Sequence, residues 1–366
     1  KRIKLFKFLA QEYVSQYGFL NLFNFITFRV GASILTSLFF SLIFGQFIIN
    51  KLSKIQPNGQ PIRNDGPQTH IIKKAGTPTM GGVLIILSVF SASVLWSDLY
   101  NSFVWIGLLA LISFGFIGII DDYNKVKSNS SNGLKAITRI ILQIVFSLII
   151  SLVILKMLDD QIDTTISFPF FKNLIINFGY FYLLISLFIL VGSANAVNLT
   201  DGLDGLAIVP VMIVAMTFAF IAYVSGNVVF SEYLLINYIP GTGELSVLCG
   251  ALIGSALGFL WFNAPPAKVF MGDTGSLALG ATLGSIALMV KHEIVLAIAG
   301  GLFVLETMSV VIQVISFKLT GKRVFRMAPL HHHYEKKGWS EPTIVIRFWI
   351  ITFVLALLSL ATLKIR

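Results

Sequence analysis

Aspartates lie at the ends of several long apolar segments of this sequence. Asp121 and Asp122 follow directly after the apolar residues 102–120, and Asp273 lies in the motif FMGDTGS, between two further apolar segments. Carboxylates that share a site repel one another, and their pKa values rise unless a cation compensates their charge. Mg2+ takes hard oxygen ligands, usually one or two carboxylates together with substrate phosphates. Because these motifs contain no cysteine, they predict a magnesium site rather than a zinc site.

Two more acids, Asp201 and Asp204, lie in the glycine-containing motif NAVNLTDGLDGLA (195–207). Their spacing places both on one face if the following helix includes them, and Asp201 or Thr200 could cap that helix. The glycines in this motif let a ligand approach the backbone closely. In FMGDTGS, glycines flank Asp273 just before a predicted helix, where backbone N–H groups can bind phosphate. Together these motifs favour a phosphate-binding site.

Three consecutive histidines, His331–His333, lie in the motif PLHHHYEKKGW. Adjacent residues rarely converge on one metal ion, and Pro329 indicates a loop. We therefore expect one or two of these histidines to contact a diphosphate rather than to bind a metal. The motif KKAGTPTMGG (73–82) combines two lysines with glycines ahead of another apolar segment, which suits the same ligand.

The elements that position these motifs are membrane helices. The chain has 366 residues, of which 56% are hydrophobic and 12% charged, with a mean hydropathy of +0.84. Apolar segments long enough to cross a hydrocarbon core of about 30 Å recur along it. We predict an all-α polytopic membrane protein with about ten transmembrane helices, over residues 22–49, 78–96, 102–120, 137–157, 174–193, 206–224, 245–262, 277–290, 294–317 and 343–363.

The connecting segments divide between two faces of the membrane. Most lysines and arginines outside the spans fall on the face that holds 50–77, 121–136, 194–205, 263–276 and 318–342. The positive-inside rule makes this face cytoplasmic, although the basic N-terminus, on the other face, argues the opposite. All the polar motifs lie on the basic face. We therefore expect one cytoplasmic active-site cleft built from several loops.

Other readings of these features stay open at this point. A transporter is one, with Glu306 inside a span as its charged group, but transporters place polar sites near the bilayer midplane, whereas these acids gather at helix ends. The stripe Gly250, Gly254 and Gly258 indicates close helix packing, either within the monomer or across a dimer. Cys249 lies in an apolar segment and is expected to be a packing residue.

The motifs resemble those of the bacterial phospho-N-acetylmuramoyl-pentapeptide-transferases, which belong to the polyprenyl-phosphate N-acetylhexosamine-1-phosphate transferases. The resemblance covers almost the whole chain and rests on FRVGASILTSL, RNDGP, GTPTMGG, DDYNK, NAVNLTDGLDGLA, FMGDTGSLALG, MAPLHHHYEKKGW and RFWII. The aspartate motifs are shared with sister enzymes that use UDP-N-acetylglucosamine, which are the first alternative. The PLHHHYEKKGW motif is typical of the muramoyl-type enzymes.

This resemblance implies a reaction and a place for it. UDP-N-acetylmuramoyl-pentapeptide and undecaprenyl phosphate would give undecaprenyl-diphospho-N-acetylmuramoyl-pentapeptide (lipid I) and UMP, in the first membrane step of peptidoglycan synthesis. The enzyme would be a Mg2+-dependent homodimer in the bacterial cytoplasmic (inner) membrane. It would have ten helices, both termini outside and its active site on the cytoplasmic face, and no nucleic acid would be a partner.

The resemblance also implies roles for individual residues. Asp273 would be the magnesium ligand, Asp121 would orient the lipid phosphate or accept its proton, and Asp122 would support the metal or nearby basic groups. His331 and His332 would contact the diphosphate or the sugar, and Lys125 and Lys135 a phosphate. Phe270 would stack on uracil. The remaining expected substrate-binding residues are Lys74, Thr79, Asn198, Asp201, Gly202, Asp204, Asn263 and His333.

Overall fold

Apolar helices dominate the structure, a computed structural model that describes residues 17–57, 59, 76–130, 132–159, 161–171 and 174–364. The long helices are α2 (Ile26–Ile55), α4 (Gly82–Trp96), α5 (Ser102–Ser128), α6 (Ala136–Met157), α7 (Phe181–Thr200), α8 (Ile208–Ser225), α10 (Leu245–Asn263), α11 (Gly272–Met289), α13 (Gly301–Thr320) and α15 (Glu341–Ala361). Shorter elements are η1 (Gly18–Asn24), α9 (Val228–Leu234), η2 (Thr242–Glu244), α12 (Glu293–Ala299), α14 (Leu330–Glu335) and the antiparallel strands β1 (Thr165–Ser167) and β2 (Ile175–Asn177).

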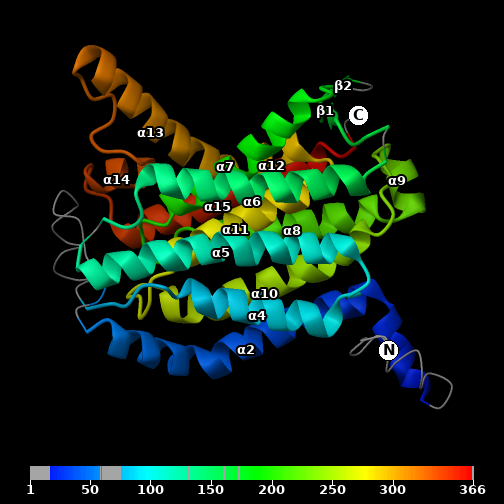
Figure 1. Cartoon of the computed structure of the whole chain (residues 1–366), viewed down its shortest axis with the longest axis horizontal. Helices are drawn as coiled ribbons and strands as arrows, with labels where there is room; N and C mark the ends of the chain where they lie inside the picture. The colour runs from blue at the N-terminus through cyan, green and yellow to red at the C-terminus, as the bar shows by residue number, and fades with distance from the viewer. Residues whose placement is uncertain are drawn as a thin grey trace.

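The predicted class, an all-α polytopic membrane protein, is confirmed. Within the described residues, 8 helices are long and apolar enough to cross a membrane. The predicted spans 78–96 and 277–290 correspond to α4 and α11, which are not among these eight. The predicted span 294–317 is divided at Gly300 into α12 and α13. Figure 1 shows α13 leaving the body of the bundle obliquely beyond this break.

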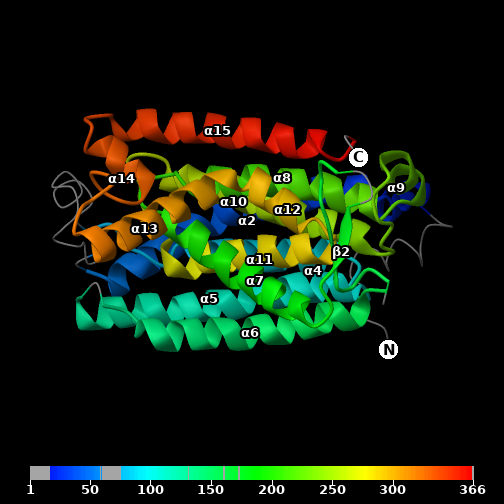
Figure 2. The same ribbon diagram turned by 90° about the horizontal axis from the view of Figure 1, so that it is seen from above.

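Helix α11 forms the centre of the bundle. Every residue from Thr274 to Met289 is buried, and Figure 2 shows α11 between α15 on one side and the pair α5 and α6 on the other. Small residues make this burial possible: a Cβ at Gly280 would collide with the backbone of Ser193 on α7. A helix that is enclosed on all sides needs no lipid-facing surface, which explains its lower hydropathy.

The glycine stripe of α10 packs within the monomer. Cβ atoms at Gly250, Gly254 and Gly258 would each collide with α2. The facing surface of α2 carries serines, and Ser37 donates a hydrogen bond to Ala251 O at 2.7 Å. The stripe is therefore a helix-packing feature of one chain, and the dimer reading of it is wrong.

Three predicted boundaries differ from the structure. Helix α5 continues past the two aspartates to Ser128, helped by an i,i+4 ion pair between Asp121 and Lys125. Helix α7 lies about seven residues later than the predicted span 174–193, because the polar 195–200 segment is helical. Helix α8 begins only at Ile208, with no side-chain cap. Asp201 and Asp204 therefore lie in a turn, and the expectation that they share a helix face or cap α8 is wrong.

The polar ends of the helices gather at one end of the bundle, at the left of Figures 1 and 2, where α5 ends and α14 lies. The opposite end carries η1, the β1–β2 hairpin, α9 and the end of α15. This arrangement brings the sequence motifs to one side, as their loop positions predicted.

We predict that a buried ion pair at the opposite end stabilises the fold. Arg29 and Glu244 have side chains only 2% and 9% exposed, and both guanidinium nitrogens Nη1 and Nη2 lie 2.6 Å from the carboxylate. Because removal of one partner leaves a buried charge uncompensated, Arg29→Met should lower the free energy of unfolding by ~3–5 kcal/mol. Thermal unfolding in detergent measures this. The double variant Arg29→Met/Glu244→Leu should lose less than Arg29→Met, and an equal or larger loss would contradict the pairing argument.

Candidate active site

Three carboxylates from two helices meet at the polar end of the bundle. Asp121 and Asp122 lie on α5, and Asp273 lies in the first turn of α11. One ligand oxygen from each lies within 4.8 Å of the other two. The first two are 1% exposed, so the group is largely shielded from solvent. The structure thus brings together the three acids that the sequence motifs indicated.

Lys125 neutralises part of this negative charge. Its ammonium nitrogen lies 2.6 Å from Asp121 Oδ2, 3.0 Å from Asp273 Oδ2 and 3.7 Å from Asp122 Oδ1. The lysine therefore stands among the three carboxylates, in the position that attracts a cation. The partners of Lys125 here are acids, and its expected contact with a phosphate stays a prediction.

Asp273 is held in its ionised form by its surroundings. Burial raises its pKa, but Lys125, Arg139 at 3.1 Å and a hydrogen bond from Asn198 Nδ2 at 2.7 Å more than offset this and lower the pKa to about 2. Asn198, in the last turn of α7, also donates to Ser276 Oγ at 2.8 Å. At neutral pH Asp273 therefore presents a carboxylate fixed by groups from three other helices.

Asp122 binds the beginning of α11. Its Oδ1 accepts a hydrogen bond from Asp273 N at 3.2 Å, and its Oδ2 accepts from Thr274 N at 3.0 Å and Thr274 Oγ1 at 2.8 Å. Gly272 has φ +72, and a Cβ there would lie 2.5 Å from Asp122 Oδ2, so glycine is required. These N–H groups were expected to bind phosphate; the structure instead gives them to Asp122, which acts as a cap donated by another helix.

Asp121 has a different environment from its neighbour. Its Oδ1 accepts a hydrogen bond from Leu134 N at 2.8 Å, and its Oδ2 faces Lys125. The chain passes so close that a Cβ at Gly133 would lie 2.5 Å from the carboxylate. Lys125 thus lies closest to Asp121 and Asp273. The carboxylate of Asp122 instead accepts hydrogen bonds from the start of α11.

The turn 201–207 is fixed by polar side chains from other segments. Asp204 accepts a hydrogen bond from Ala267 N at 3.0 Å, and its own N–H donates to Glu341 Oε1. Asn263 accepts from Gly205 N at 3.0 Å and donates to Val269 O at 2.9 Å. The expected uridine and diphosphate residues of this region therefore already serve to hold two loops together.

The three histidines have three separate partners. His331 Nδ1 lies 3.2 Å from Glu306 Oε1, and His332 Nδ1 lies 2.6 Å from Glu335 Oε2. His333 Nδ1 accepts from Arg326 N at 3.1 Å, and partial burial with nearby Lys337 and Arg326 lowers its pKa. Among the described residues the histidines do not join the acidic group.

The remaining predicted site residues differ in how the structure places them. Thr79 is buried and exchanges backbone hydrogen bonds with the Gln56 side chain. Phe270 is partly buried and accepts from Gly81 N through its carbonyl. Lys135 is exposed at the start of α6, and Lys74 lies outside the described residues. Their roles stay predictions.

The sequence motifs did not identify Arg139 or Thr274 as site residues. Arg139 lies in an apolar helix and reaches Asp273 only because α6 packs beside α5. Thr274 was part of a quoted motif, but its two hydrogen bonds to Asp122 depend on α5 meeting α11. Arg139 carried one signal in the sequence: it is a basic residue within one turn of the polar end of a helix.

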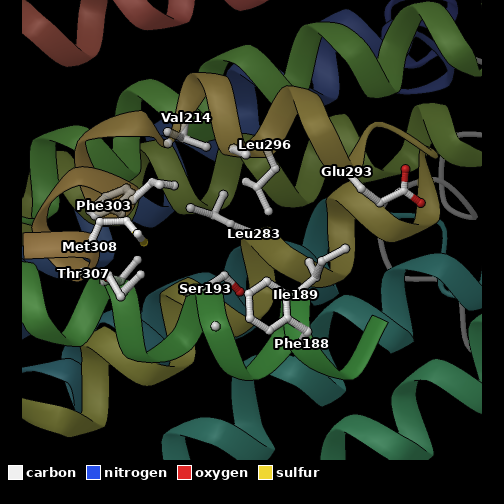
Figure 3. A pocket seen from close by; sticks show the side chains of 17 residues that line it. Phe188, Ile189, Ser193, Val214, Leu283, Glu293, Leu296, Phe303, Thr307 and Met308 are labelled. Atoms are coloured by element: carbon white, nitrogen blue, oxygen red, sulfur yellow. The ribbon is translucent and has the colours of Figure 1, made fainter. Parts of the chain in front are cut away.

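An apolar cavity of about 290 Å³ lies between α7, α11, α12 and α13. Figure 3 shows Leu283, Leu296 and Phe303 lining it, with Glu293 at one edge. The cavity lies where α13 diverges from the bundle. Its lining suits a hydrocarbon ligand.

Comparison with known proteins identifies the family. The model for glycosyl transferase family 4 matches residues 104–291, and the model for phospho-N-acetylmuramoyl-pentapeptide-transferase signature 1 matches residues 74–86. A relative from Pelagibacter ubique (strain HTCC1062), named phospho-N-acetylmuramoyl-pentapeptide-transferase, is 58% identical over 358 residues, which cover 98% of this chain and 99% of the relative. The site geometry and this similarity along the whole chain agree, and the chain belongs to the phospho-N-acetylmuramoyl-pentapeptide-transferase family.

Proposed function

We propose that this protein transfers phospho-N-acetylmuramoyl-pentapeptide from its UDP-linked precursor to undecaprenyl phosphate, forming lipid I and UMP. The observation that carries this proposal is the 58% identity, over 98% of the chain, to a relative of that name. In this reaction a phosphate oxygen of the lipid attacks the sugar-linked phosphorus, and the bond to the UMP phosphate breaks. Catalysis of such a transfer consists mainly of positioning and charge stabilisation.

The cluster of three carboxylates, Asp121, Asp122 and Asp273, is suited to bind a divalent cation. Its donors are hard oxygens, and Lys125 occupies the place where positive charge is favoured. Asp273 would hold Mg2+. Mg2+ held there would supply positive charge to the diphosphate. Lys125 and Arg139 would bind substrate phosphates, and Asp121 would orient the lipid phosphate. Asp122 keeps the start of α11, and with it Asp273, in place.

The apolar cavity beside α13 is our candidate site for the polyprenyl chain. A lipid phosphate acceptor needs an apolar path that opens to the bilayer and leads to the polar end of the bundle. Helix α13 has only 22% of its apolar window buried, so lipid reaches its surface. The cavity would bind part of the acceptor chain near the membrane interior.

Filling this cavity should weaken acceptor binding selectively. Gly192 lines the cavity on α7, and a Cβ there meets no atom within 4 Å. Gly192→Phe should raise the KM for undecaprenyl phosphate about 10-fold, roughly 1.4 kcal/mol of apolar contact, and leave the KM for the UDP-linked substrate unchanged. Gly31→Phe, at an open glycine on α2, is the matched control. Equal changes in both KM values would contradict this location.

We further propose that the polar end faces the cytoplasm of a bacterial inner membrane, as the distribution of basic loops favours, and that the enzyme is a homodimer. The glycine stripe of α10 gives the homodimer no support, since it faces α2. A transporter is disfavoured because the acids lie at helix ends on one side of the bundle.

UMP release by the purified protein tests the proposed function. The assay supplies undecaprenyl phosphate with either UDP-N-acetylmuramoyl-pentapeptide or UDP-N-acetylglucosamine, and either Mg2+ or a chelator. We expect Mg2+-dependent UMP from the muramoyl substrate alone. UMP from the acetylglucosamine substrate alone would assign the sister activity instead, and no UMP from either would overturn the proposal.

A further inference from the structure

Glu306 is a buried charge that the reaction described above does not use. It lies on α13, a candidate membrane helix whose apolar window is only 22% buried. The side chain of Glu306 is nevertheless 0% exposed. A buried carboxylate is unfavourable unless it is paired or hydrogen-bonded, and inside a membrane helix it usually has a function. The partners of Glu306 should therefore reveal what it does.

Both contacts of this carboxylate are made with one residue of α14. Glu306 Oε1 accepts a hydrogen bond from His331 N at 3.2 Å and lies 3.2 Å from His331 Nδ1. Helix α14 follows Pro329 and has no side-chain cap of its own, so Glu306 satisfies a backbone N–H that would otherwise be unpaired. One side chain thus binds the backbone of His331 and lies beside Nδ1 of its ring.

The ring of His331 lies between this carboxylate and a neighbouring turn. Nδ1 lies 3.2 Å from Glu306 Oε1, and Nε2 faces the turn that contains Gly202, where a Cβ would collide with Nε2. His331 is 1% exposed, and neither ring nitrogen has a hydrogen-bond partner among the described residues. The ring is therefore held, buried and unsatisfied, against the motif expected to bind the nucleotide diphosphate.

We infer that Glu306 is a positioning residue that holds His331 with Nδ1 towards the carboxylate and Nε2 towards a uridine-diphosphate sugar at the Asp201–Gly205 turn. The inference rests on the proposed function for the identity of that ligand. Carboxylates that orient a functional imidazole in this way usually change activity by about 10–100-fold when removed. Gly202 contributes by leaving room for the ring.

A double-mutant cycle tests this inference. Glu306→Gln should lower kcat/KM for the UDP-linked substrate about 10-fold, and Gly202→Ala should do the same by displacing the ring. Neither substitution should lower activity further in a His331→Ala background, because residues that act as a unit are not additive. Losses that multiply in that background would overturn the inference.

Two controls separate this role from a loss of folding and from failure of the proposed function. Ser309→Ala removes the hydroxyl that donates to the backbone carbonyl of Glu306 at 2.7 Å but keeps the Glu306 carboxylate, so it should lower kcat/KM by much less than Glu306→Gln. Binding of the UDP-linked substrate without acceptor is measured in parallel and needs no turnover. Binding that Glu306→Gln leaves unchanged would overturn this inference alone. A wild-type protein that binds no uridine-diphosphate sugar would overturn both proposals.

Discussion

Asp273→Asn is expected to lower the rate of UMP release by about 10³-fold or more, because the fixed charge beside the reacting phosphates is lost. Asp273 is contacted by Lys125, Arg139 and Asn198, and its pKa of about 2 keeps it ionised throughout the neutral range. Asparagine keeps the shape of the side chain but not its charge. The NH2 group of the asparagine would also have to face Lys125, Arg139 or Asn198, which are themselves donors. Both effects remove the cation site that the arrangement supports.

The rate is measured against Mg2+ concentration, so that weaker metal binding is distinguished from a slower reaction. Asp98→Asn is the matched control and should leave activity unchanged. Asp98 N donates to Glu244, in the buried ion pair at the opposite end of the bundle, and Asp98 Oδ1 accepts a hydrogen bond from Tyr100 N. If Asp273→Asn kept a tenth of the wild-type rate at the same Mg2+ requirement, Asp273 would not be the metal ligand.

Sequence patterns predicted those site residues whose type the chemistry requires. They did not predict the residues that reach the site only through helix packing. Asp121, Asp122 and Asp273 were identified because acids beside long apolar segments are unfavourable unless they are used. Hydropathy could not place the end of α7, since Asn198 is polar yet helical, its amide bound by Asp273 and Ser276. The distinct environments of the two neighbouring aspartates were also hidden, because Asp122 meets α11 across 151 residues of sequence.

That difference between neighbours leads to the second large effect, at Asp122. Asp122→Ala removes three hydrogen-bond acceptor contacts from the start of α11 and should lower UMP release about 100-fold, mainly by displacing Asp273. Asp122→Asn keeps only one acceptor oxygen and turns an amide group towards an N–H, so its loss should be intermediate. Asp121→Ala leaves these contacts intact and should change the reaction rate with less effect on the Mg2+ concentration required.

Thr274→Val is the matched control for the Asp122 series. It removes the hydroxyl donor to Asp122 Oδ2 but keeps the backbone N–H. UMP release should therefore fall by about 10-fold, which is the lower end of the about 1.5–3 kcal/mol that one hydrogen bond to a charged group contributes. Mg2+ titrations of all four variants distinguish the roles. If Asp122→Ala kept the wild-type Mg2+ requirement while Asp121→Ala raised it, the metal would depend on Asp121, and Asp122 would not position Asp273. A raised Mg2+ requirement in Asp122→Ala, partly restored in Asp122→Asn, would instead mean that the cap on α11 determines where the metal ligand stands.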